Sequence, residues 1–101
     1  MWEDIYQVTR LSRDEIAQKL SSLLEISFTR RDSWSVGWYF KTLKDRSEIL
    51  ITANWFDKGE LVCPELPEGV FVTISGDDRI SLLRDRLEGL SYLELFESTE
   101  F

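Results

Sequence analysis

Few side chains in this chain of 101 residues are suited to catalysis. It contains no histidine, which removes the commonest general acid or base and the commonest metal ligand. The one cysteine, Cys63, precedes Pro64 and has no histidine to activate its thiol, so we expect a small structural residue rather than a nucleophile. Gly76 has no glycine-rich phosphate loop around it. No catalytic residue is therefore assigned, and we expect the protein not to be an enzyme.

Asp77 and Asp78 are the best candidates for a metal site. Adjacent carboxylates could bind Mg²⁺ in a phosphotransfer site. The same two residues stand where a helix is expected to begin, and there an aspartate satisfies free backbone N–H groups and suits the helix dipole. Capping explains both residues, so we expect no metal and no cofactor. A stoichiometric metal or nucleotide in the purified protein would revive a small hydrolase or transferase.

Arg30 and Arg31 lie close in sequence to Trp34, Trp38 and Tyr39, an arrangement that superficially resembles basic residues between base-stacking aromatics. An ordinary strand end followed by core aromatics explains the same residues. The net charge of −7 also opposes a phosphate backbone. We expect no nucleic-acid partner.

The acidic charge is concentrated in the later part of the chain. Residues 1–46 hold eight Lys or Arg and seven Asp or Glu, whereas residues 47–101 hold four and twelve, a balance of −8. Such a field repels nucleic acid and anionic lipid and attracts a cationic partner. An acidic surface that only keeps the protein soluble is the plainer interpretation. Between residues 57 and 78 a single lysine, Lys58, faces six acids: Asp57, Glu60, Glu65, Glu68, Asp77 and Asp78.

The chain contains four tryptophans, more than a core this small must contain. Trp34 lies in a polar turn and Trp55 at a strand end beside the acidic segment, so each is either a partly buried rim residue or an interface residue. Acidic side chains around an aromatic anchor would speed encounter with a basic protein. The predicted partner-binding surface consists of Trp34, Trp55, Asp57, Glu60, Glu65 and Glu68.

The element that organises the chain is a predicted hairpin over residues 35–56. Apolar and polar side chains alternate on both sides of a polar turn at residues 44–47, which is typical of two paired strands. Both faces of the hairpin carry apolar groups, so we expect it to be central in a sheet with something packed on it. The two prolines and two glycines of residues 57–69 predict a loop.

The other elements follow from periodicity and capping. Ser12 and Glu15 have the spacing of a capping box at the start of an amphipathic helix that ends near residue 24. A second helix is predicted from Asp77 to Gly89, with Ile80, Leu83 and Leu87 as its buried stripe. Strands are predicted at residues 4–10, 25–32, 70–75 and 92–96, and a loose tail at 97–101.

The element order β-α-β-β-β-β-α-β predicts an α+β fold, a two-layer sandwich of two helices on a mainly antiparallel sheet of five to six strands. The length suits a single domain over residues 1–101. No apolar run is long enough to span a membrane, the N-terminus lacks the layout of a signal peptide, and one cysteine fits a reducing compartment. We therefore expect a cytoplasmic protein with no membrane partner.

The layout resembles small acidic immunity proteins of bacterial polymorphic-toxin systems, including contact-dependent growth inhibition. The resemblance is carried by the segments SLLEISFTRRDS, GWYF, EILITANWF and GVFVTISG and the acidic, proline-bearing loop before the last of them. It implies a cytoplasmic inhibitor that binds one cognate toxin, often a cationic nuclease, and blocks its active site or substrate channel. No residue roles are transferred from the family.

The leading hypothesis is a non-catalytic immunity protein that neutralises a basic toxin through an acidic surface. The alternative is an accessory or assembly subunit that adds an exposed sheet edge to a larger complex. We expect the protein itself to be a monomer or a weak dimer.

Overall fold

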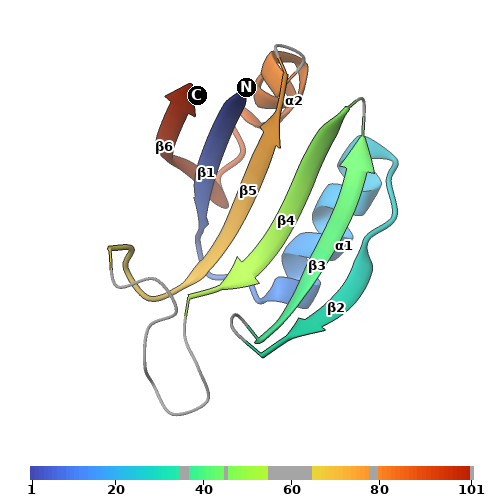
Figure 1. The fold of residues 1–101 in the computed structure, drawn as a ribbon, viewed down its shortest axis with the longest axis vertical. Coiled ribbons are helices and arrows are strands. Elements are labelled where there is room, and N and C mark those ends of the chain that lie inside the picture. Colours follow the sequence, from blue (N-terminus) through green and yellow to red (C-terminus); the bar gives the residue numbers. More distant parts are fainter. Residues whose placement is uncertain (35–36, 45, 55–64, 78–79, 101) are drawn as a thin grey trace.

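The computed structural model describes residues 1–34, 37–44, 46–54, 65–77 and 80–100. Six strands and two helices form an α+β fold in the predicted order (Figure 1). The elements are β1 Trp2–Val8, α1 Arg13–Leu24, β2 Thr29–Ser33, β3 Gly37–Lys44, β4 Ser47–Ala53, β5 Val70–Gly76, α2 Ile80–Leu87 and β6 Leu93–Glu100.

The strands form one antiparallel sheet in the order β2-β3-β4-β5-β1-β6. The predicted hairpin is confirmed as β3 and β4, with Lys44 opposite Ser47 at the turn. β4 and β5 are central, and β2 and β6 are the edges. Both helices lie on one side of the sheet, behind it in Figure 1, so the described elements form two layers and no helix among the described residues lies on the other sheet face.

Helix α1 begins where the capping box predicts. The Ser12 hydroxyl accepts from the backbone N–H of Glu15, and the Glu15 carboxylate accepts from the backbone N–H of Ser12 at 3.0 Å. These bonds, chiefly the one from the Ser12 backbone, lower the pKa of Glu15. The helix ends at Glu25, which adopts a left-handed conformation with φ 55°. Neither helix in the described part of the chain is long and apolar enough to cross a membrane.

The core lies between the helices and the sheet. Alternate residues of the central strands turn to this side, so β4 contributes Ile49 and Ile51 and β5 contributes Val72 and Ile74, as the alternation predicts. The helices supply the opposing layer through Ile16, Leu20 and Leu24 of α1 and Leu83 and Leu87 of α2. Burial of these apolar side chains is the main source of stability.

Several predicted boundaries are wrong. β1 begins at Trp2 rather than at residue 4, and β2 begins at Thr29 because Ile26 and Phe28 pack against the core before the strand starts. The predicted tail is also wrong, because β6 continues to Glu100 and pairs with β1 along its whole length. Its polar composition signals a tail, whereas backbone pairing with β1 determines the strand.

Candidate functional site

The sheet face without helices, here called the open face, is formed by every second residue of each strand. Residues directly opposite in paired strands point to the same side, so the register assigns each side chain to a face. Tyr39, Leu50 and Ile5 lie on the open face, whereas their neighbours Phe40, Ile51 and Tyr6 face the helices. Three rows cross the open face: Arg31, Tyr39, Thr52, Phe71, Gln7 and Glu94; then Thr29, Lys41, Leu50, Thr73, Ile5 and Glu97; then Leu43, Glu48, Ser75, Glu3 and Thr99.

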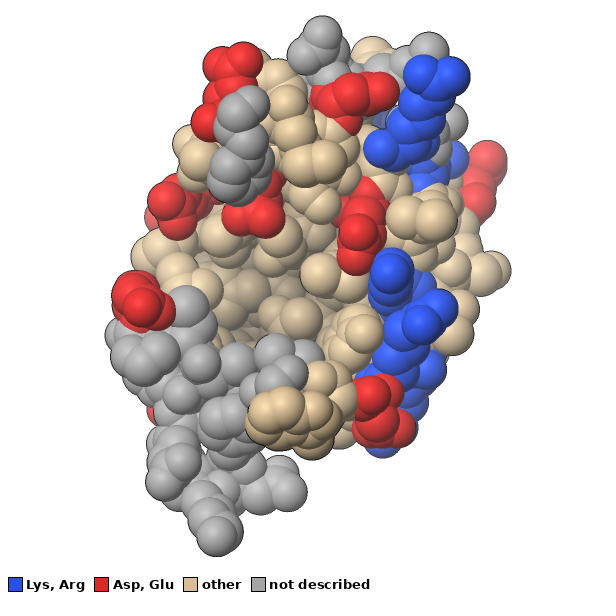
Figure 2. All heavy atoms as spheres, viewed as in Figure 1, with Lys and Arg blue, Asp and Glu red and all other residues tan. Residues whose placement is uncertain are grey.

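Charges of opposite sign lie at opposite sides of this face. Glu3, Glu94 and Glu97 on β1 and β6 form an acidic margin, and Arg31 and Lys41 on β2 and β3 form a basic margin. Figure 2 shows the open face, with red side chains gathered toward β6 and β1, blue ones toward β2 and β3, and an uncharged hollow between them. Lys41 pairs with Glu48 of the same face at 3.6 Å, whereas the ion pairs found among the described residues do not involve Arg31 or the acidic margin.

The centre of the open face is apolar and hydroxyl-bearing rather than charged. A depression of about 240 Å³ lies over β2, β3 and β4, and Tyr39, Leu50 and Thr52 form most of its floor with Ser33 and Glu48. On the other side of the centre stands Phe96, the extra residue of a β-bulge in β6. Its ring is 44% exposed and packs edge-on against Phe71 at 5.9 Å. The face thus has a shallow hollow and a separate aromatic knob.

The predicted partner-binding residues lie elsewhere. Trp34 follows β2 and is 97% exposed, the most exposed large apolar side chain among the described residues. β4 ends and β5 begins at this same end of the sheet, where Ala53 pairs with Val70. It is also the end where β2 finishes and β3 starts, with Ser33 opposite Gly37. Glu65 and Glu68 in this connection are exposed. Trp55, Asp57 and Glu60 lie outside the described residues.

The two arginines of the nucleic-acid candidate point to opposite faces. Arg31 lies on the open face opposite Tyr39. Arg30 of β2 stacks on the Trp38 ring. The guanidinium of Arg13 in α1 lies 3.4 Å from the centre of the same ring and donates to the Trp38 backbone carbonyl at 2.8 Å. These cation–π contacts attach α1 to the edge of the sheet. They give Arg30, Arg13 and Trp38 a structural role and do not form a row of stacking aromatics.

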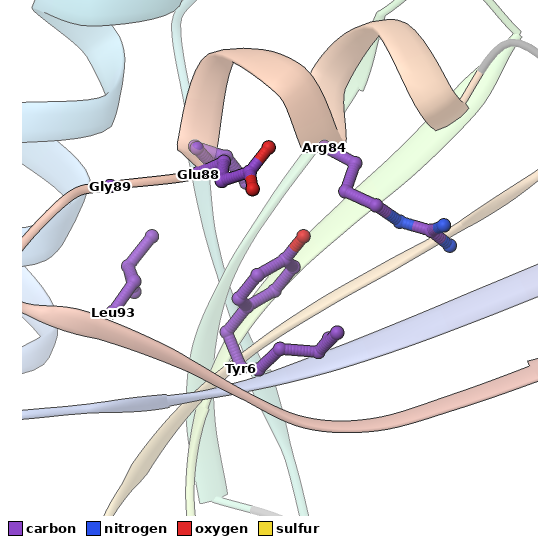
Figure 3. A pocket seen from close by; sticks show the side chains of 7 residues that line it. Tyr6, Arg84, Glu88, Gly89 and Leu93 are labelled. Carbon is purple, nitrogen blue, oxygen red and sulfur yellow. The ribbon is translucent and has the colours of Figure 1, made fainter.

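A second cavity, of about 270 Å³, lies on the helix side beneath the end of α2. Figure 3 shows the Tyr6 ring standing below the helix with its hydroxyl directed toward it, between Glu88 and Arg84. Leu87, Leu93 and Leu95 complete most of the lining. Gly89, with φ 84°, ends α2 beside the cavity in a conformation that glycine adopts easily.

Next to this cavity Arg84 holds a buried carboxylate. The Arg84 guanidinium donates to Asp4 through Nε at 2.7 Å and through Nη2 at 2.8 Å, and the Ser98 hydroxyl donates to Asp4 at 2.6 Å. Asp4 is 1% exposed. The hydrogen bonds to Asp4 raise the pKa of Arg84. This network joins α2 to β1 and β6, which is a positioning role.

The phenol in this cavity keeps its proton at neutral pH. Burial raises the pKa of Tyr6 to about 12, the Asp4 carboxylate adds to the rise, and Arg84 opposes it. Within the described residues the Tyr6 hydroxyl has no hydrogen-bond partner. The described ranges also hold no cluster of three or more Cys, Asp or Glu side chains that could bind a metal ion. Asp77 is exposed, and Asp78 lies outside those ranges.

The acidic margin is the part of the site that the sequence-based prediction missed. Its signal was the alternation in β1, where Glu3, Ile5 and Gln7 share one side and Asp4 the other, but this alternation does not reveal which side the helices cover. Glu97 falls in the predicted tail, whereas Glu94 falls in the predicted strand at residues 92–96, which carries no predicted site. Comparisons of the chain with protein-family models, with curated proteins and with solved structures found no match.

Proposed function

We propose that this chain is a non-catalytic inhibitor, of the immunity-protein kind, that binds a basic protein through the acidic margin of its open face. The observation that supports this most is the position of Glu3, Glu94 and Glu97, which lie beside the exposed ring of Phe96 on a face without helices. An aromatic anchor with charged neighbours is a common arrangement at protein interfaces. A basic toxin, most simply a nuclease domain, would dock here and have its active site covered, in the cytoplasm of the producing cell.

The chemistry of the cavity under α2 and of the depression on the open face favours binding over catalysis. The polar groups that line the cavity under α2 are the Tyr6 phenol, which has a high pKa, Arg84, which is already bonded to Asp4, and the Glu88 carboxylate. The depression on the open face is lined by hydroxyl and apolar groups with one carboxylate, Glu48, which lies 3.6 Å from Lys41. Neither arrangement pairs a nucleophile with a base.

The first step is to read the neighbouring gene. If it encodes a large secreted protein, the C-terminal domain of that protein is purified as a catalytically inactive variant and used as the partner. Glu97→Lys is expected to slow association by about tenfold at low ionic strength, with a smaller effect at high salt. The matched control is Asp85→Lys, since Asp85 is exposed on α2 and gives the same change in net charge. Equal effects of the two variants, or no binding by the unmodified protein, would overturn the proposal.

The second candidate is an accessory subunit that binds through a sheet edge. β2 and β6 each pair on one side only, which leaves backbone groups along the other side. Charged side chains protect such edges against strand addition, and β2 carries Arg30, Arg31 and Asp32 while β6 carries Glu94, Glu97 and Glu100. The charged edges therefore make the open face the better candidate surface.

A further inference from the structure

We infer that the open face also binds a second copy of this chain, in a face-to-face dimer whose two-fold axis runs along the strands between β4 and β5. This inference goes beyond the proposed function and does not depend on it. It rests on the distribution of charge and shape over the three rows of the open face.

The rotation that builds this dimer places opposite charges together. A two-fold axis along the strands puts β6 of one copy over β2 of the other, and β1 over β3. Because the first row begins with Arg31 and ends with Glu94, each Arg31 then faces the Glu94 of the second copy. Lys41 of one copy likewise lies next to Glu97 of the other copy. A two-fold axis across the strands would instead place the acidic margins against each other, which costs free energy.

The shapes of the two sides agree with the same rotation. The depression lies on the β2–β4 side of the axis, and Phe96 stands on the β6 side. The rotation brings the ring of Phe96 from one copy over the depression of the other, whose floor is Tyr39, Leu50 and Thr52. An exposed aromatic ring that fills an apolar hollow is a typical anchor of an interface. The dimer would contain this contact twice because the axis makes it isologous.

The face is large enough for a stable interface. The molecule measures 37 × 28 × 25 Å along its principal axes, and Figures 1 and 2 look down the shortest axis onto the open face. Specific interfaces bury about 800 Å² on each partner, less than this outline offers. Packed sheets hold their strands within about 30° of each other, which preserves the row-on-row pairing approximately.

The dimer interface overlaps the acidic margin proposed above to bind a basic protein. The competition described in this paragraph, unlike the dimer itself, rests on the proposed function. The dimer covers the acidic margin with the basic margin of the second copy. A basic partner and a second copy would therefore compete for Glu94 and Glu97, and the partner would bind the monomer.

The test is sedimentation equilibrium of the full chain at low ionic strength, from micromolar to millimolar concentration. The unmodified protein should approach a dimer and stop there, since the interface closes on itself. Arg31→Glu and Glu94→Arg should each weaken self-association about tenfold or more, because each places two pairs of like charges in contact. An equimolar mixture of the two variants should form a heterodimer, since both charge pairs are then restored.

Two controls separate the open face from the helix side. Phe96→Ala should weaken the dimer, whereas Leu95→Ala should leave it unchanged, since Leu95 is 47% exposed but lines the cavity under α2. Lys19→Glu makes the same charge change as Arg31→Glu on an exposed position of α1 and should also leave it unchanged. A monomer at millimolar concentration, an open-ended polymer, or a variant mixture that stays monomeric would each overturn the inference. None of these results would affect binding of the basic partner at the acidic margin.

Discussion

The two faces of the sheet are built from the same strands but differ in what covers them. On the helix side, Ile49, Ile51 and Val72 are fully buried under α1 and α2. On the open face, their neighbours Leu50 and Thr73 are only partly covered, and no helix lies over them. The residues of β4 therefore alternate between the core and the surface, whereas Phe71 of β5 is buried on the open face, where the Phe96 ring packs against it.

The charged groups on the two faces differ in the same way. Asp4 on the helix side accepts hydrogen bonds from Arg84 and Ser98. Glu3, the next residue along β1, lies on the open face, and the ion pairs found in the described ranges leave it out. A buried carboxylate needs its partners, whereas a partly exposed one such as Glu3 can also contact a second protein. Substitutions at adjacent residues of one strand can therefore be compared directly, since one residue lies on each face of the sheet.

The largest expected effect is on stability and comes from the apolar residues of β4, which differ in burial between the two faces. Ile51→Ala should lower the free energy of unfolding by about 2–5 kcal/mol, because it opens a cavity in the core. Leu50→Ala removes a side chain of similar size from the open face and should cost less than about 1 kcal/mol. Urea denaturation at a concentration that keeps the protein monomeric measures both values. Equal losses would mean that the open face is part of a packed core.

The next largest effect on stability concerns Asp4 and Glu3, two adjacent carboxylates of β1 that lie on opposite faces of the sheet. Asp4→Asn should lower the free energy of unfolding by about 1–3 kcal/mol, since it weakens a charge-assisted network that joins α2 to the sheet. The loss stays below that of a fully buried ion pair because the Arg84 side chain reaches solvent. Glu3→Gln should change stability by less than about 0.5 kcal/mol. Thermal unfolding of the two variants measures both losses. A larger loss of stability for Glu3→Gln than for Asp4→Asn would contradict the difference proposed between the two faces.

The smallest effect concerns Tyr6, which is 4% exposed. Its pKa is about 12 in the folded protein, against an ordinary value of 10.0. The unfolded chain therefore loses this proton first, so the stability contributed by the neutral phenol is present below pH 10 and is lost as the pH rises through about 12.

Tyr6→Phe removes this titration. The variant should be as stable as the unmodified protein at pH 7, or slightly more stable, because the hydroxyl has no hydrogen-bond partner among the described residues. Its stability should also decline less between pH 9 and pH 12. Chemical denaturation across this pH range is the measurement. A large loss at pH 7 would show that the hydroxyl is bonded in solution.

Local signals predicted the parts of the fold that depend on neighbours in sequence. The capping box of Ser12 and Glu15 fixed the start of α1, since both of its bonds form within three residues. The strand predicted at residues 70–75 is confirmed as β5, in which Val70, Val72 and Ile74 lie in the core. The fold class followed from the order of such elements.

Pairings between distant residues could not be predicted in this way. Arg84 and Asp4 are 80 residues apart, and nothing near Asp4 in the chain marks it as buried. The strand at the C-terminal end of the described chain consists mostly of polar residues and becomes a strand through its pairing with β1. The open face depends on which side receives both helices, and periodicity leaves this undetermined because both sides of β3 and β4 carry apolar residues.

The central claim is that the open face, and not the helix side, is where this molecule contacts protein. Side-chain methyl NMR spectra recorded from micromolar to millimolar concentration test it most directly. The methyl signals of Ile5 and Leu50 on the open face should shift with concentration, while those of Ile49 and Ile51 on the helix side should stay in place. Shifts confined to the helix-side methyl groups would contradict the account, and an absence of shifts at every concentration would overturn the dimer.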